Sequence, residues 1–112
     1  MRNDKGKNGV FSASNELMLD KADALIEKGQ YVKAVSLIRR ALENQPASFE
    51  TKLFLAEVYH DMELYALSNN GLFELMRKEP KNPDVLLLLG KNYLELNELS
   101  LCGYYFKLYS EN

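Results

Sequence analysis

Residues 27–46 read EKGQYVKAVSLIRRALENQP, and residues 61–80 read DMELYALSNNGLFELMRKEP. The two stretches carry a tyrosine, a small residue and a closing proline at matching places, and the same spacing separates each pair: Tyr31 and Tyr65, Ala34 and Ser68, Pro46 and Pro80. A fixed period of this size, about 34 residues, is typical of chains built from one repeated unit, because each unit buries its apolar face against a neighbour. The two stretches therefore predict a repeat architecture.

The apolar residues within each repeat are spaced for helices. Val32, Val35 and Ile38 fall on one side of a helix over residues 31–42, and Pro46 follows it as a stop signal. The same pattern predicts six helices: the first from residue 15 to residue 28, and the others over residues 31–42, 49–62, 65–77, 85–96 and 100–109. No segment alternates with a period of two for long enough to indicate a strand. The predicted fold class is therefore all-α.

Small and large residues recur at fixed places in the repeat. Small residues recur with the same spacing as Tyr31 and Tyr65 in two sets. The first set is Ala22, Ala56 and Gly90, and the second is Ala34, Ser68 and Cys102. Large residues recur at Leu25, Tyr59 and Tyr93, and at Ile38, Leu72 and Phe106. Two antiparallel helices approach closely only where the side chains at their crossing are small, and larger side chains then fill the layers beside it. The pattern predicts stacked helical hairpins.

These features resemble the tetratricopeptide repeat (TPR) family, whose unit is a helix–turn–helix of about 34 residues. The residues that carry the resemblance are Gly29, Tyr31, Ala34, Ala41 and Pro46, then Leu55, Ala56, Tyr59, Tyr65 and Pro80, then Leu89, Gly90, Tyr93 and Phe106. The resemblance covers repeats 15–48, 49–82 and 83–112, the last incomplete, and implies an α-solenoid of three helix pairs in a right-handed superhelix. Glu63 and Asn97 replace the turn glycine of the family, and Lys21 replaces a large apolar residue.

Composition narrows the class of protein. The 112 residues have a net charge of −2, of which residues 1–14 contribute +2, so the repeats are mildly acidic and no nucleic-acid partner is expected. Residues 1–14 are polar, contain two glycines and are expected to form a flexible N-terminal leader. A single cysteine excludes an internal disulfide, and no apolar run is long enough for a signal peptide or a membrane span. We therefore expect a cytoplasmic protein without a membrane partner.

The residues capable of catalysis have no partners at suitable spacing. His60 is the single histidine and lacks metal ligands or a nucleophile nearby in the sequence. Cys102 falls at a small-residue place of the repeat, so packing explains it better than reactivity does. Asp20, Asp23 and Glu27 share one side of the first helix, which favours a solvated surface over acid–base chemistry. We expect no enzyme activity, no cofactor and no metal.

The resemblance implies a binding surface, because in TPR arrays the first helix of each pair lines a concave groove that holds a peptide or helix of another protein. Carried onto this chain, the peptide-binding groove consists of Leu19, Asp23, Ile26, Glu27, Leu53, Phe54, Glu57, His60, Asp61, Leu87, Lys91, Leu94 and Glu95. It is an apolar strip with mainly acidic flanks. The expected partner is a protein or peptide, as an amphipathic helix or extended segment with apolar and basic residues.

One subclass of the family does not match. TPR domains that clamp the acidic tails of heat-shock chaperones use Lys and Asn residues in the first helices. Leu19, Asp23, Phe54, Asp84 and Leu88 stand at the corresponding places here, and two of them have the wrong charge for that role. The sequence therefore argues against this clamp.

The C-terminal segment suggests an alternative function. Residues 104–109 read YYFKLY, and one neighbouring helix cannot bury all of these aromatic and aliphatic side chains. The possible self-association face consists of Tyr104, Tyr105, Leu108 and Tyr109. Ordinary partial exposure, homo-oligomerisation through this face and a longer parent chain all remain open. A small TPR export chaperone is a third possible function.

Overall fold

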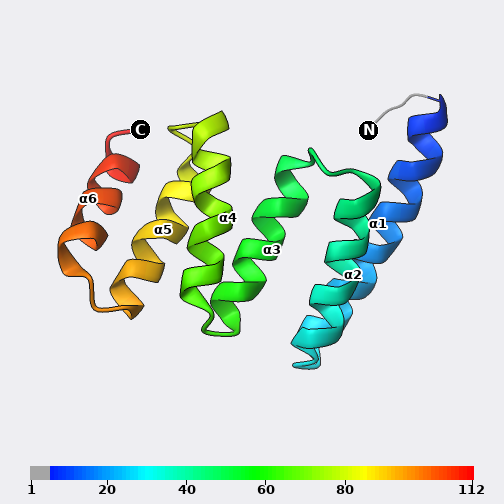
Figure 1. Cartoon of the computed structure of the whole chain (residues 1–112), viewed down its shortest axis with the longest axis horizontal. Helices are drawn as coiled ribbons and strands as arrows, with labels where there is room; N and C mark the ends of the chain where they lie inside the picture. Colours follow the sequence, from blue (N-terminus) through cyan, green and yellow to red (C-terminus); the bar gives the residue numbers. More distant parts are fainter. Residues whose placement is uncertain (1–5) are drawn as a thin grey trace. The chain divides into compact units, whose positions relative to one another are not determined.

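The fold is all-α, as the sequence predicts. The computed structural model describes residues 6–112, with side chains described from Ser14 onward. It contains six helices, each named by its bounds: α1 Gly6–Glu27, α2 Tyr31–Asn44, α3 Phe49–Asp61, α4 Tyr65–Lys78, α5 Pro83–Glu95 and α6 Leu99–Ser110 (Figure 1). Residues 6–112 include no strand. The six predicted helices are confirmed, and only the start of α1 departs clearly from its predicted bounds.

The start of α1 differs from the prediction. A flexible leader was expected over residues 1–14, but α1 begins at Gly6, so residues 6–14 are helical. Residues 1–5 lie outside the described part of the chain. The difference has a simple cause, because adding residues to an existing helix avoids the cost of nucleation, and this segment contains no proline.

The chain divides into two compact units, residues 1–51 and residues 52–112. In the first unit, α1 and α2 form an antiparallel hairpin. Asn15 is almost fully buried in this hairpin: its Nδ2 donates to the Ala41 carbonyl at 3.1 Å and to Gln45 Oε1 at 2.9 Å. Asn44 Nδ2 donates to Asn15 Oδ1 at 2.9 Å. These bonds satisfy a buried amide and join the start of the repeat to the end of α2.

The three turns inside the helix pairs share one backbone geometry. Gly29, Glu63 and Asn97 have φ values of 76°, 64° and 60°. At each turn, the following residue donates its N–H to the carbonyl of a residue in the last turn of the preceding helix at 2.8 Å, in the pairs Gln30–Leu25, Leu64–Tyr59 and Glu98–Tyr93. This is the Schellman motif, whose left-handed position favours Gly or Asn. The repeat is therefore present in the backbone as well as in the sequence.

The second unit is packed around small residues, as the repeat predicts. Ala56, Ser68 and Cys102 are buried, and Gly90 on α5 lies directly under the ring of Phe106 on α6. A Cβ added at Gly90 would overlap that ring. Helices α4, α5 and α6 lie side by side, and Leu72, Leu75, Leu86 and Leu89 form the fully buried layers between them.

Candidate functional site

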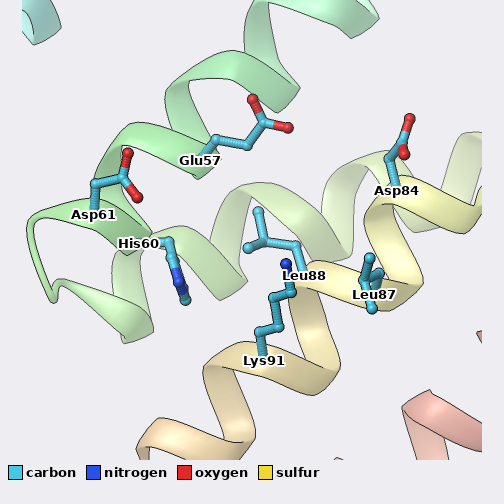
Figure 2. A pocket seen from close by; sticks show the side chains of 7 residues that line it. All are labelled: Glu57, His60, Asp61, Asp84, Leu87, Leu88 and Lys91. Atoms are coloured by element: carbon cyan, nitrogen blue, oxygen red, sulfur yellow. The ribbon is translucent and has the colours of Figure 1, made fainter. Parts of the chain in front are cut away.

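A pocket of about 210 Å³ lies in the second unit between α3 and α5, the first helices of the second and third repeats. Its lining residues come from both helices: Glu57, His60 and Asp61 from α3, and Asp84, Leu87, Leu88 and Lys91 from α5 (Figure 2). This volume is smaller than typical ligand pockets of roughly 300–1,000 Å³. The pocket is therefore suited to one side chain of a larger partner.

The pocket combines an apolar base with negative charge. Leu88 is buried and Leu87 half-buried, while the carboxylates of Glu57, Asp61 and Asp84 and the ammonium of Lys91 are exposed. The Lys91 side chain extends along α5 toward Leu88, as helical side chains do when they point toward the N-terminus (Figure 2). Three carboxylates against one ammonium give a net charge of −2 around the pocket. A positively charged group is therefore favoured there.

His60 is held from behind by a network of buried polar groups. Its Nδ1 lies 2.6 Å from Oδ1 of Asn92, a residue of α5 with no exposed surface. Asn92 Nδ2 donates to Ser68 Oγ and to Asn69 Oδ1, both at 2.8 Å, and Ser68 Oγ donates to the Ala56 carbonyl at 2.8 Å. The network joins α3, α4 and α5, so it fixes the His60 ring relative to the helix on the other side of the pocket.

Tyr65 contacts the same histidine from α4. The rings of His60 and Tyr65 meet edge to face with their centroids 5.4 Å apart. Partial burial raises the pKa of Tyr65 above its ordinary value, and the charges of Glu95 and Glu63 and a hydrogen bond to the Glu95 carboxylate raise it further. Glu95 thus acts on the Tyr65 phenol, and the Tyr65 ring contacts the His60 ring.

Five of the predicted groove residues come together at this pocket, namely Glu57, His60, Asp61, Leu87 and Lys91. Four others lie outside its lining: Leu53 and Phe54 are half-buried on α3, Leu94 is exposed on α5, and Glu95 is engaged with Tyr65. Leu19, Asp23, Ile26 and Glu27 lie on α1, in the other unit, with both carboxylates exposed and both apolar residues half-buried. The role of these four in partner binding stays a prediction.

Two lining residues, Asp84 and Leu88, were not predicted as part of the groove. Leu88 stands one repeat length after Phe54, which is part of the predicted groove. The repeat could therefore have placed Leu88 in the groove as well. Asp84 lies in the first turn of α5, one turn before Leu87 and Leu88. Among the described residues, no three His, Cys, Asp or Glu side chains are grouped so that they could hold a metal ion.

The proposed self-association face needs a correction at Tyr105. Tyr105 is buried and stacks on Tyr93 of α5, with ring centroids 5.8 Å apart and planes nearly parallel. Tyr104 and Tyr109 are exposed by 56% and 40% of their surface, and Leu108 is half-buried. A helix that packs on one neighbour buries only the side that faces it. Tyr105 lies on the side of α6 that faces α5, so it points inward. The exposed apolar side chains of α6 are therefore Leu99, Leu101, Tyr104 and Tyr109, and Leu108 is half-buried.

Several solved structures have the same fold. The second TPR domain of Spaghetti (RPAP3), bound to the HSP90 peptide SRMEEVD, matches with a TM-score of 0.73 and 14% identity over 85% of this chain and 88% of that one. The Arabidopsis OM64 TPR domain matches with a TM-score of 0.77 and 19% identity, covering 91% and 88% of the two chains. MamA gives 0.75 and 18%, covering 88% of this chain and 54% of its own.

These similarities define the class: the chain has the fold of TPR domains, an all-α helical repeat. The resemblance seen in the sequence is thereby confirmed at the level of the fold, while the handedness of the superhelix stays a prediction. No protein-family model and no curated protein sequence matches the chain. Within residues 6–112, no helix has the length and apolarity needed to cross a membrane.

Proposed function

We propose that the chain is a non-catalytic protein–protein interaction module that binds a basic and apolar segment of another protein at the pocket between α3 and α5. The observation that carries this proposal is the combination of an apolar base at Leu87 and Leu88 with the negative charge of Glu57, Asp61 and Asp84. An apolar anchor and adjacent opposite charge are the two elements by which a groove recognises an amphipathic segment.

The structural neighbours support a peptide-binding role for this chain. The charge of its pocket, however, indicates a ligand that differs from the acidic peptide of the Spaghetti domain. The TPR domain of Spaghetti binds a peptide, SRMEEVD, that is rich in carboxylates. A peptide of that charge would be repelled by the three carboxylates around this pocket, and the sequence lacks the Lys and Asn residues expected of a chaperone clamp. The proposed partner therefore carries Lys or Arg beside its apolar residues.

A selection from a random peptide library tests this proposal. The immobilised chain is expected to enrich peptides with apolar residues next to Lys or Arg. The double variant Glu57→Lys, Asp61→Lys should lose these peptides, because it reverses the charge of the pocket. The control Glu43→Lys, Glu74→Lys makes the same change in net charge at places outside the pocket and should keep them. Enrichment of acidic peptides by the unmodified chain would refute the proposal.

Self-association through α6 is the second candidate function. Tyr104, Tyr109 and Leu101 leave an exposed apolar face on a helix whose only charged residue is Lys107. Such a face favours contact with another apolar surface, because burying it removes apolar area from water and desolvates few charges. The export-chaperone alternative has no observation of its own to favour it.

A further inference from the structure

We infer that the pocket selects an arginine side chain of the partner, and that His60 is the residue that recognises it, through a ring nitrogen fixed from inside the protein as a hydrogen-bond acceptor. This inference rests on the proposed function, since it names the group that enters the proposed binding pocket. The observation behind it is the arrangement of donors and acceptors in the buried network that contacts His60.

The Ala56 carbonyl at one end of this network can only accept a hydrogen bond. Ser68 Oγ lies 2.8 Å from it and must donate its single proton there. Ser68 Oγ can therefore only accept from Asn92, so the amide group that faces it is Nδ2 and not Oδ1. Hydrogen-bond partners of this kind are what decide the orientation of an amide.

The orientation of Asn92 then decides the tautomer of His60. Both protons of Asn92 Nδ2 are engaged, one by Ser68 Oγ and one by Asn69 Oδ1. Asn92 Oδ1, which carries no proton, faces His60 Nδ1 at 2.6 Å. Nδ1 must therefore carry the proton, and in the neutral ring Nε2 is left with a free lone pair. Nε2 belongs to a side chain that lines the pocket.

The other polar groups of the pocket are also mainly acceptors. The carboxylates of Asp61 and Asp84 accept hydrogen bonds and carry negative charge, and Lys91 is the one side chain of the lining that donates without accepting. The matching group has several donors, no acceptor, positive charge and flat apolar faces that pack on leucine. A guanidinium has all four properties, whereas an ammonium is a compact, strongly hydrated charge. The pocket is therefore expected to prefer arginine to lysine.

Nitrogen NMR of the ¹⁵N-labelled chain tests the first half of the inference without any substitution. When the ring is neutral, we expect a protonated Nδ1 and an unprotonated Nε2 for His60. A proton on Nε2 would overturn the inference, because the nitrogen would then be a donor and would repel a guanidinium.

The second half is tested with three small probes, the N-acetyl amides of arginine, lysine and citrulline. Arginine amide should shift the His60 Nε2 resonance at a concentration several-fold lower than lysine amide, and citrulline, which is the neutral analogue, should have no effect. In His60→Phe, which keeps a ring against Tyr65, the backbone amide resonances of the pocket report binding, and arginine amide should bind about ten-fold or more weakly than in the unmodified chain, because a hydrogen bond to a charged group is lost. Equal responses to arginine and lysine, or no loss in His60→Phe, would overturn the inference.

Failure of this inference differs from failure of the proposed function. If the pocket binds basic peptides without preferring arginine, the charge-reversed variant still loses the selected peptides, and only the role of His60 is wrong. If the proposed function fails, charge reversal leaves peptide selection unchanged, whatever the tautomer of His60.

Discussion

Glu63 has a φ of 64° at a turn where the first repeat has Gly29. A left-handed backbone costs a residue with a Cβ roughly 1–2 kcal/mol, and the greater freedom of glycine in the unfolded chain offsets about 0.5–1 kcal/mol of that. We therefore expect Glu63→Gly to raise the free energy of unfolding by about 0.5–1 kcal/mol, measured by urea denaturation. Glu63→Gln keeps the strained backbone and is the control. A glycine variant no more stable than the glutamine variant would contradict this account.

For individual residues, the sequence predicts most of the left-handed turn positions. It does not predict the hydrogen-bond network behind His60. The left-handed turn at Asn97 follows from the local preference of Asn. The contacts of Asn92 depend instead on residues 23 to 32 positions away, which only tertiary packing brings together. One signal was available: Asn92 stands one repeat length after the buried Val58, and a polar residue at an apolar place of a repeat indicates a buried partner.

Between elements, the contact of α5 with α6 depends on the absence of a side chain at Gly90. A Cβ there would overlap the Phe106 ring, so we expect Gly90→Ala to lower the free energy of unfolding by about 1–3 kcal/mol. Gly103→Ala, on α6 with open space around it, should instead raise it by about 0.5–1 kcal/mol, since alanine is the better helix former. Urea denaturation of both variants checks this. Equal effects would show that Gly90 is not under steric constraint.

The stacked pair Tyr93 and Tyr105 predicts a loss of stability at alkaline pH. Burial, and then the neighbouring Tyr93 and Tyr104, raise the pKa of Tyr105 above its ordinary value. The folded chain therefore holds the phenol proton more tightly than the unfolded chain, and the free energy of unfolding falls as pH rises above about 10, the unperturbed tyrosine pKa. Tyr105→Phe should make this fall shallower in urea denaturation series. Tyr109→Phe, which removes an exposed phenol from the same helix, is the control, and an equal change in both variants would contradict the assignment.

The bounds of the helices were largely predictable from the sequence, except for the start of α1. Proline, glycine and the turn residues that replace glycine mark the ends of most helices, so their bounds follow from the sequence. The start of α1 has no such marker, because a polar segment without proline can either extend a helix or remain unstructured. The inward direction of Tyr105 was also not predictable, since in an aromatic run every residue is a candidate for the core.

For the whole molecule, the exposed face of α6 predicts self-association. We expect the molar mass from light scattering to rise above 12.9 kDa with concentration, because Tyr104 and Tyr109 are buried when copies meet. The double variant Tyr104→Ser, Tyr109→Ser should stay monomeric. The control Val32→Ser, Leu67→Ser removes two other exposed apolar residues and should still self-associate. A constant 12.9 kDa for the unmodified chain would refute self-association and leave the pocket proposal unaffected.

The central claim is that a partner binds at the pocket between α3 and α5. The most direct test is to titrate a library-selected peptide into the ¹⁵N-labelled chain and to follow the backbone amide resonances. The largest shifts are expected on Glu57, Asp61, Leu87 and Lys91, four of the residues that line the pocket. Shifts concentrated instead on Tyr104 and Tyr109 of α6, with the pocket residues unchanged, would contradict it.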